Sequence, residues 1–527
     1  MSSLFDLPQS IGELSSNSSA KYRYEEVAPL RDVAGTNFSN GAISFKWQTS
    51  SGNWWQPSKS FLRLRAKFSA LRDGEEYPVS VADDLAVNMD AVSNLFQSME
   101  FRIHNKTVSR VGDYVSQVSA LHKRLSKSRA HLESVGQSTN AMSHDFGLRQ
   151  SLICKDAVVS AETPTLTYLT KAELGIPAAV TLETKAAQSQ AIVGVGAPNV
   201  FRPGDKIRIG AASYDVITVT PSAGTYVLGI DPAPGDSAAS NATVFARLRS
   251  EASVNALGKQ NIEFCYVPPL SIFGISHCMP AGDWELTLNP QVSGQWERRL
   301  VESALGSKTP GVEYKITIDS LSLQVAVMNG PRMDSGSYVL DLESLRCQTD
   351  SISSTALSSK YFDVSPSTVA LAIAYQDIRA GSNTLNSPSK FKVGNANNTV
   401  REQELALNRF YVSYAGLQRP SPDSSAAFNV DTDRTAERYL DTMIESGAFF
   451  SEGGCETLRE FQSRGTYYFF SYPKDGSDRS TRVQISNQFQ SDADVSNMRV
   501  LLFDLYKSVC RVQMKDGAIV NVELEDV

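Results

Sequence analysis

The sequence predicts a mainly β protein made of two β-sandwiches in tandem. Three observations support this prediction. Short runs of alternating, β-branched and aromatic residues recur between clusters of Gly, Pro, Asn and Asp; helical periodicity is confined to two stretches; and one order of elements occurs twice. The chain has 527 residues, which at about 150 residues per domain is enough for three or four folding units.

The predicted strands are spread along the whole chain. Each combines β-branched or aromatic residues with turn-forming residues on both sides, a composition that suits a pleated and half-buried surface. Many short strands of this kind are typical of sandwiches and barrels. They cover residues 43–47, 61–68, 99–103, 262–267, 284–288, 314–327, 369–375, 410–414, 466–472 and 498–512.

The first helical stretch lies between residues 111 and 132. Its apolar residues fall on one face of a helix, and Gly136 follows where that helix would end. The rest of the surface is basic, and for such residues on one helix a solvated face is the usual role. The basic residues are Lys123, Arg124, Lys127 and Arg129.

A second, shorter amphipathic helix is predicted over residues 435–444, with Gly447 just beyond its end. Both helices follow a strand and a turn, in MEFRIHNKTVS and in RFYVSYAGLQRPS. Later strands, IEFCYVPPLSIFG and GTYYFFSYPKDG, end at proline, and GDWELTLNP and GAIVNVELEDV close the two halves. The two halves share the order of their elements rather than their amino-acid sequence, which predicts an internal duplication of one sandwich.

This plan divides the chain into a flexible N-terminal arm at 1–24, a first sandwich at 25–305 and a second at 306–527. The arm is Ser-rich and too poor in apolar residues to fold alone. Residues 163–249 interrupt the first sandwich, since aromatic residues become rare there and turns separate short strands. We expect a small inserted β domain that projects from the molecule, because an insertion survives only where a loop already leaves the packed layers.

Composition and charge exclude several classes of protein. The formal net charge of -7 argues against a chain that neutralises nucleic-acid phosphates. No apolar run approaches the roughly 20 residues of a membrane-spanning helix. The first twenty residues have no basic segment followed by an apolar one, so we expect no secretory signal. The cysteines are scattered without a CxxC pair and are interpreted as reduced core residues. They are Cys154, Cys265, Cys278, Cys347, Cys455 and Cys510.

The sequence contains no recognisable catalytic, cofactor-binding or metal-ligating constellation. His104, His122, His131 and His144 are close in sequence but form neither HExxH nor a pair on one helical face, so structural roles are expected. Motifs for a nucleotide or an activated nucleophile are missing from the sequence. Three carboxylate pairs are nominal glycosidase candidates in polar stretches, where solvated loop residues are the ordinary expectation. The pairs are Glu75 with Glu76, Asp83 with Asp84, and Glu402 with Glu404.

Two aromatic groups are expected in the core or in subunit contacts rather than as sugar-binding platforms. One group is Trp47, Trp54 and Trp55, and the other is Tyr467, Tyr468, Phe469 and Phe470. Alternating members of such a run point to opposite faces of a sheet.

Several segments resemble a known family. ISFKWQTSSGNWWQPSKSFLRLRAKFS and LAVNMDAVSNLFQSMEFRIHNKTVSRVGDYVSQVSALHKRLSKS are similar to the first jelly roll of double jelly-roll major capsid proteins, in particular those of virophages and Polinton-like viruses. VPPLSIFGISHCMPAGDWELTLNP resembles the end of that roll, and residues 314–527 resemble the second roll. The similarity is carried by an Asn-rich segment, a Leu-Phe step, an Asn-centred turn and a Tyr before a helix. These are Asn88, Leu95 with Phe96, His104-Asn105-Lys106 and Tyr114.

The resemblance implies two eight-stranded jelly rolls and a structural, non-enzymatic role without cofactors. It implies homotrimers with a pseudo-hexameric outline, which assemble with neighbouring capsomers, penton proteins and minor or cement proteins into an icosahedral virion shell around a DNA genome. The inserted domain at 163–249 would face outward and could meet a host receptor. An acidic chain without a basic arm also suits a container that does not bind nucleic acid specifically. The alternative is a β-rich viral or cell-surface attachment module.

Overall fold

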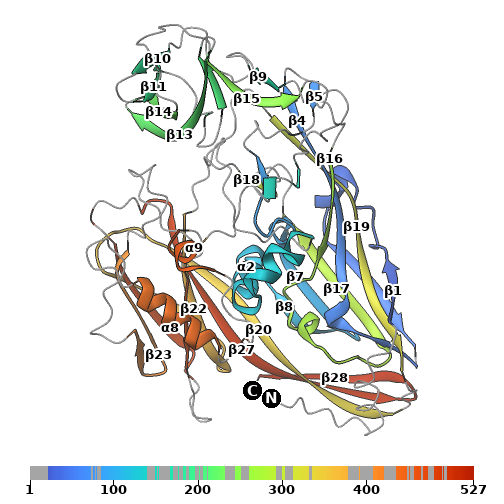
Figure 1. Ribbon diagram of the computed structural model, residues 1–527. Coiled ribbons are helices and arrows are strands. Elements are labelled where there is room, and N and C mark those ends of the chain that lie inside the picture. Colours follow the sequence, from blue (N-terminus) through green and yellow to red (C-terminus); the bar gives the residue numbers. More distant parts are fainter. Residues whose placement is uncertain are drawn as a thin grey trace.

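Most of the chain is β-strand, arranged as two sandwiches side by side with a further sheet at one end (Figure 1). The computed structural model describes residues 22–50, 52–72, 75–77, 79, 85–138, 149–150, 152–153, 166–169, 176, 182–185, 189–195, 201, 206–209, 212–222, 224–231, 244–250, 260–291, 300–302, 313–330, 335–377, 391, 407–420, 435–447, 450, 456–463, 467–472, 480–489, 491 and 495–526.

The first sandwich has eight principal strands in two antiparallel sheets. One sheet has the order β1-β19-β4-β16, and the other has the order β2-β17-β7-β8. Short strands extend these sheets or pair with each other. The principal strands are β1 (Tyr22–Val27), β2 (Ile43–Thr49), β4 (Phe61–Arg72), β7 (Phe96–Ile103), β8 (Lys106–Val111), β16 (Gln260–Tyr266), β17 (Gly282–Pro290) and β19 (Glu313–Asn329), and the short ones are β3 (Asn53–Trp55), β5 (Glu75–Tyr77), β6 (Ala86–Val87) and β18 (Val301–Glu302).

The second sandwich repeats this arrangement. Its sheets have the orders β20-β27-β22-β25 and β21-β26-β23-β24, and β28 pairs with β27 in addition. When the principal strands are counted along the chain, both sandwiches have one sheet with the order first, eighth, third, sixth and one with the order second, seventh, fourth, fifth. The strands are β20 (Gly336–Ser351), β21 (Ser358–Asp363), β22 (Thr368–Asp377), β23 (Leu407–Tyr414), β24 (Leu417–Arg419), β25 (Tyr467–Ser471), β26 (Arg482–Phe489), β27 (Met498–Lys515) and β28 (Ala518–Asp526).

The predicted tandem of two β-sandwiches is therefore confirmed, with two corrections to the repeated plan. GDWELTLNP is β17, the seventh strand, whose counterpart is β26 and not the closing segment of the chain. GAIVNVELEDV is β28, an added strand without a counterpart in the first sandwich. The two segments look alike in sequence because each is a strand near the end of its half. Only the strands with which they pair show that one is a seventh strand and the other an additional strand.

The expected boundary at 305/306 also differs from the structure. β19 lies beyond that boundary but pairs with β4 over eleven rows, from Glu313 opposite Leu71 to Gln324 opposite Phe61. It is the eighth strand of the first sandwich, so we place the boundary after Asn329. The expected arm at 1–24 overlaps β1, whose Tyr22 lies opposite Met328 of β19. The remainder of the arm, 1–21, lies outside the described residues.

The cores follow the alternation of the strands. In β2 every second residue is buried, and Trp47 packs against Trp55 with ring centroids 5.2 Å apart. Phe101 stacks on Trp55 at 5.3 Å and Trp284 lies 5.2 Å from Trp55, which makes an aromatic centre for the first sandwich. Such aromatic pairs add about 0.5–1.5 kcal/mol each to their burial. Buried residues of both sandwiches form one continuous hydrophobic cluster.

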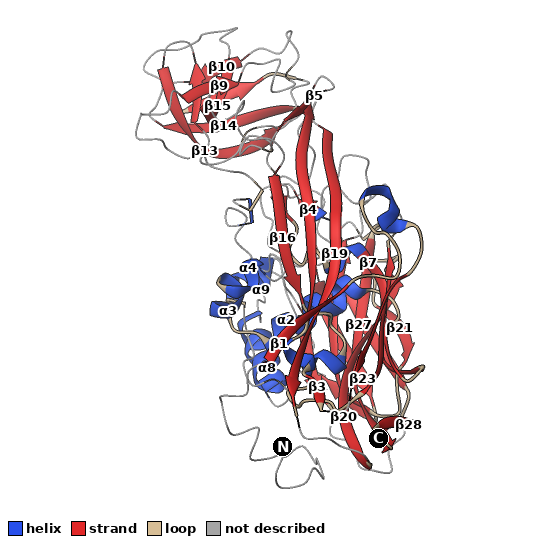
Figure 2. Cartoon of the chain, turned by 90° about the vertical axis from the view of Figure 1, so that its right-hand side faces the viewer, coloured by secondary structure: helices blue, strands red, loops and turns tan. Residues whose placement is uncertain are grey.

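The described α-helices lie toward one side of the molecule in Figure 2. The stretch predicted as one helix over 111–132 is instead the end of β8, α2 and α3, because Lys127 is extended and Ser128 caps α3 by accepting a hydrogen bond from the His131 backbone N–H. Gly136 lies within α4, and Gly447 ends α8. The helices are α2 (Val115–Ser126), α3 (Arg129–Glu133), α4 (Val135–Ser138), α8 (Thr435–Gly447) and α9 (Leu458–Ser463), with 3-10 turns η1 (Gly35–Ser39), η2 (Pro57–Lys59), η4 (Ser93–Leu95) and η6 (Ser271–Gly274).

The further sheet has seven strands in the order β10-β11-β14-β13-β12-β15-β9. It has its own hydrophobic cluster, separate from that of the sandwiches, with Phe201, Ile207 and Leu228 fully buried in it. All its strands fall at or within one residue of the segment 163–249. We propose that this segment is an inserted domain. The strands are β9 (Leu166–Leu169), β10 (Leu182–Lys185), β11 (Gln190–Val193), β12 (Lys206–Ile209), β13 (Ala212–Ser222), β14 (Thr225–Asp231) and β15 (Val244–Ser250).

Candidate functional site

The contact between the two sandwiches, which we call the seam, is built around α2. This helix starts at Tyr114, whose backbone is left-handed at φ 58°. The Tyr114 hydroxyl lies 2.8 Å from the Thr349 hydroxyl of β20. One turn later, Gln117 is within hydrogen-bond distance of Gln376 of β22, at 3.3 Å. Val118, Leu121 and Leu125 of α2 belong to the hydrophobic cluster. Every residue from Val115 to Leu121 is buried, so this part of the helix is covered on all sides.

A fully buried ion pair crosses the seam. Arg124 Nε lies 2.7 Å from Glu456 Oε1, and neither side chain is exposed. The guanidinium also lies over the ring of Phe391 at 4.6 Å. Next to it, Arg129 joins Glu460 of α9 at 2.6 Å. A buried pair of this kind contributes little net free energy, but removing one member leaves an uncompensated charge.

These contacts correct the expectation of a solvated basic face at Lys123 and Arg124, whereas Arg129 remains partly exposed. Arg124 is buried, and the mostly buried Lys123 extends to Asp90 at 2.9 Å. The basic residues of the helix therefore pair with carboxylates that are distant in sequence. The first sandwich supplies Asp90 and the second supplies Glu456, and the amino-acid pattern of the helix alone reveals neither.

Asp90 anchors the Asn-rich segment inside the first sandwich. It has a left-handed backbone at φ 63°, and its carboxylate accepts hydrogen bonds from Lys123 and from the Ser119 hydroxyl. A second buried pair, Arg149 with Glu302, fixes the two-stranded sheet β6–β18, and Arg149 also donates to the Val87 carbonyl at 2.5 Å. In both arrangements a buried carboxylate pairs with a cationic side chain.

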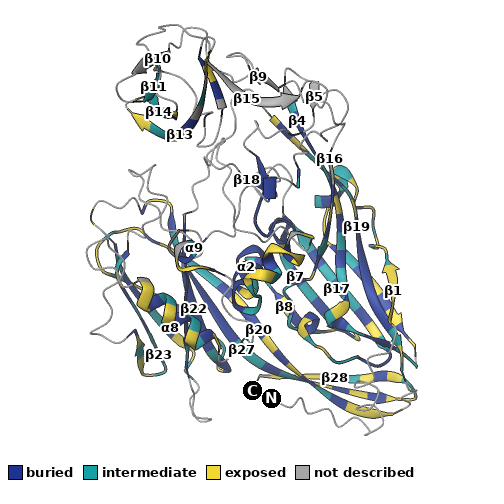
Figure 3. Cartoon of the chain, in the orientation of Figure 1, coloured by how far each residue is buried: buried dark blue, intermediate teal, exposed yellow. Residues whose placement is uncertain are grey.

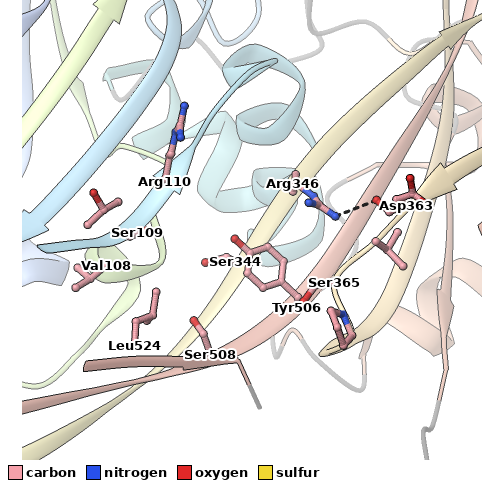
Figure 4. A pocket seen from close by; sticks show the side chains of 13 residues that line it. Val108, Ser109, Arg110, Ser344, Arg346, Asp363, Ser365, Tyr506, Ser508 and Leu524 are labelled. Carbon is pink, nitrogen blue, oxygen red and sulfur yellow. Dashed lines mark hydrogen bonds between the residues drawn. The ribbon is translucent and has the colours of Figure 1, made fainter. Parts of the chain in front are cut away.

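A groove of about 460 Å³ opens along the seam between β8 and strands of the second sandwich (Figure 4). Arg110 and Arg346 lie on opposite sides of it, and Ser109, Ser344 and Ser508 line it with hydroxyls. The Ser271 hydroxyl links the two sandwiches there, since it lies 2.9 Å from Ser109 Oγ and 3.3 Å from Ser344 Oγ.

One charged residue of the groove, Arg346, is paired inside the second sandwich. Arg346 binds the buried Asp504 through two contacts, Nε to Oδ1 at 3.0 Å and Nη2 to Oδ2 at 2.9 Å. Burial raises the pKa of Asp504, while the hydrogen bond and charge of Arg346 act in the opposite direction. Ser109 and Ser344 each lie within hydrogen-bond distance of the Ser271 hydroxyl. Serine hydroxyls of both sandwiches thus meet in this groove.

Within the described part of the chain, no group of three or more His, Cys, Asp or Glu side chains is placed to hold a metal ion. His104 sits in the β7–β8 turn at φ 46°, and His122 stands edge-on to the Phe450 ring at 6.2 Å. Cys347 and Cys510 are buried, and burial raises the pKa of the Cys510 thiol to about 12. His144, Cys154 and Cys455 lie outside the described residues.

The described residues show no site that is formed by the carboxylate pairs. Glu75 and Glu76 lie in β5 at the edge of β4. Asp83, Asp84, Glu402 and Glu404 lie outside the described residues. The aromatic groups, in contrast, are core: Tyr467 to Phe470 of β25 are all buried, Tyr468 against Phe410 at 4.5 Å and Phe469 against Phe450 at 6.2 Å.

The residues behind the family resemblance occupy structural positions. Asn88 is buried and its backbone N–H donates to Leu300. His104 and Asn105 both have positive φ, which a tight turn between β7 and β8 requires. In the second sandwich, Ala415 and Gly416 form the matching turn between β23 and β24, also at positive φ. Sequence reasoning found the hairpins but missed Asp90, Arg149, Glu302 and Glu456, which carry no local pattern.

No family model and no curated protein matches this sequence. Solved structures do match it. A chain in the 3.5 Å cryo-EM structure of the Sputnik virophage matches with a TM-score of 0.50 and 9% identity, covering 96% of this chain and 88% of that chain. The mavirus major capsid protein matches with a TM-score of 0.42 and 11% identity, covering 100% and 96%. The Faustovirus major capsid protein matches with a TM-score of 0.42 and 9% identity, covering 98% and 92%.

At these identities the comparison concerns the fold. The virophage match covers nearly the whole chain, and the two sandwiches have the same strand order. The chain therefore has the double jelly-roll fold, and its resemblance to double jelly-roll major capsid proteins is confirmed at the level of that fold.

Proposed function

We propose that this chain is the major capsid protein of a DNA virus. In this proposal three chains form a homotrimer with a pseudo-hexameric outline, and trimers assemble into the icosahedral shell of the virion. The single observation that supports it most is the repetition of one strand order in two sandwiches. Two similar units per chain give six similar units when three chains close a ring.

The seam supports the same conclusion. Buried pairs such as Arg124 with Glu456, together with one continuous core, hold the two sandwiches in a fixed relation. A rigid pair of units suits a building block, because a closed ring and a curved shell both require a defined angle between subunits. The proposed role is structural and not enzymatic, in agreement with a groove that is lined by serine hydroxyls and by the Arg346–Asp504 pair.

The proposed partners are other copies of the chain, neighbouring capsomers, penton proteins and minor or cement proteins. The described residues include no helix that is long and apolar enough to cross a membrane. The seven-stranded sheet lies beyond the end of the two sandwiches, next to β4 and β5 (Figure 1). A unit in this position with its own core suits an outward-facing attachment to a host receptor, which we include in the proposal.

The test is the assembly state of the purified full-length chain. Light scattering at micromolar concentration should give the mass of a trimer. Electron microscopy should show uniform particles with a hexagonal outline, or closed shells. A folded monomer by light scattering and circular dichroism would contradict the proposal, and elongated single particles would favour an attachment module instead.

A further inference from the structure

Helix α8 of the second sandwich is the counterpart of α2, because each follows the hairpin of the fourth and fifth strands. Their surroundings differ. α2 is covered by its own sandwich and by β20, the first strand of the next sandwich, through Tyr114 and Thr349. α8 is covered on one side only. Tyr439 packs against Phe461 at 5.3 Å, and its hydroxyl donates to the Glu456 carbonyl at 2.6 Å.

The outer side of α8 carries an apolar stripe, formed by Ala436, Leu440 and Ile444, which we call the α8 stripe. These residues are spaced four apart and so share one face of the helix. Leu440 is 57% exposed and Ile444 is 65% exposed. Two large aliphatic side chains at this spacing on a helix of an otherwise well-packed sandwich indicate a contact that a single chain does not complete. The exposed band on α8 is visible in Figure 3.

The first strand of the first sandwich is uncovered as well. β1 is the counterpart of β20, and Tyr22 and Tyr24 on it are 43% and 46% exposed. Their rings lie 5.5 Å apart, and Tyr24 stands edge-on to Phe61 of β4 at 5.4 Å. We call these three aromatic residues the β1 face. No described segment covers it, whereas the corresponding strand β20 is covered by α2.

The molecule thus has one completed contact between a post-hairpin helix and the following sandwich. The second post-hairpin helix and the first strand of the first sandwich both leave large apolar or aromatic side chains exposed. The halves lie on opposite flanks in Figure 1, with α8 on the left and β1 on the right. In Figure 2, which is viewed from the β1 side, α8 lies behind β1 at a similar height. A neighbouring chain can therefore bring its β1 face to the α8 stripe in a head-to-tail contact, which gives a ring when the rotation from one copy to the next closes.

We propose that the α8 stripe binds the β1 face of a second copy of this chain, as α2 binds the second sandwich within one chain. This inference rests on the proposed trimer and names the surfaces that would hold it together. Leu440 and Ile444 would pack on the rings of Tyr22 and Tyr24, and three such contacts would close the trimer.

The test places charge on the stripe of the full-length chain. Leu440→Glu with Ile444→Glu should weaken association by about 100-fold or more, since two carboxylates would be buried at the centre of the contact. Light scattering should then give a monomer with unchanged circular dichroism and thermal unfolding, because both positions are exposed in the single chain. The matched control is Val195→Glu with Ile217→Glu, two exposed apolar positions of the seven-stranded sheet, which should remain trimeric.

Complementary charge identifies the partner. Tyr22→Lys with Tyr24→Lys should also weaken the trimer, and combining it with Leu440→Glu and Ile444→Glu should restore association at low salt. A trimeric L440E/I444E variant would overturn the inference while leaving the proposed function intact. Loss of the trimer without rescue would overturn the assignment of β1 as the partner. A monomeric wild-type chain, measured first, would contradict the proposed function itself.

Discussion

Arg124 shows how a single residue connects the two halves of this protein. It follows Lys123 on α2, in a basic stretch, yet it is fully buried and bonded to Glu456, 332 positions away in the sequence. The pairing satisfies two charges that would otherwise be costly to bury. The pair contributes more to fixing how the two sandwiches dock than to the net free energy of folding, because both ions lose their hydration when the sandwiches dock.

Removing one member of this pair should therefore be more harmful than removing both. Glu456→Gln should lower the free energy of unfolding by about 3–5 kcal/mol, because it leaves the Arg124 guanidinium buried without its carboxylate. Arg124→Met combined with Glu456→Gln should recover much of that loss. Urea unfolding followed by circular dichroism measures both. If the single and the double variant are destabilised equally, the loss of stability does not come from an unpaired buried charge.

At the scale of elements, β28 ties the end of the chain back to the first sandwich. Ile519 of β28 is 4% exposed and approaches β17 at Gly282. A Cβ on Gly282 would lie 2.6 Å from Ile519 Cδ1 and 2.8 Å from Trp284 Cζ2. Glycine at this position permits the strand and the indole to pack against each other without a gap.

Gly282→Ala should accordingly destabilise the chain by about 1–3 kcal/mol through overpacking. Ile519→Val removes the Cδ1 atom and, combined with Gly282→Ala, should recover part of the loss, since the contact with Trp284 remains. Thermal unfolding of the four chains forms a double-mutant cycle. Additive effects of the two substitutions would contradict the close approach of β28 to β17.

At the scale of the whole molecule, the sandwiches and the seven-stranded sheet have separate hydrophobic clusters. Segments with separate cores and a connection at one end can fold independently of each other. The seam, by contrast, joins the two sandwiches into one cluster, so neither sandwich is expected to be stable without the other.

Replacement of residues 163–250 by a short Gly-Ser linker should therefore leave a soluble chain that still forms trimers. Its melting temperature should change little, because no residue of the sandwich cluster is removed. Light scattering and differential scanning calorimetry of the shortened and full-length chains provide the comparison. If the shortened chain is insoluble or monomeric while the full-length chain is a trimer, the segment belongs to the core or to the subunit contact.

Local sequence determined the strands, because alternation and turn residues are properties of neighbouring positions. Every predicted stretch, from 43–47 in β2 to 498–512 in β27, lies in a strand or differs from one by a residue at its end. It also revealed the duplication and the hairpins before α2 and α8. The helix α9 was missed, although Thr457 and Glu460 form a reciprocal cap at its start.

Only the tertiary structure decided which sheet each strand joins. β19 belongs to the first sandwich because it pairs with β4, some 250 positions earlier, and β28 extends β27 instead of repeating β17. The seam depends on the same kind of information. Arg124, Asp90 and Arg149 pair with partners that no periodicity indicates, since the favourable energy of a buried ion pair arises only when distant segments have been brought together.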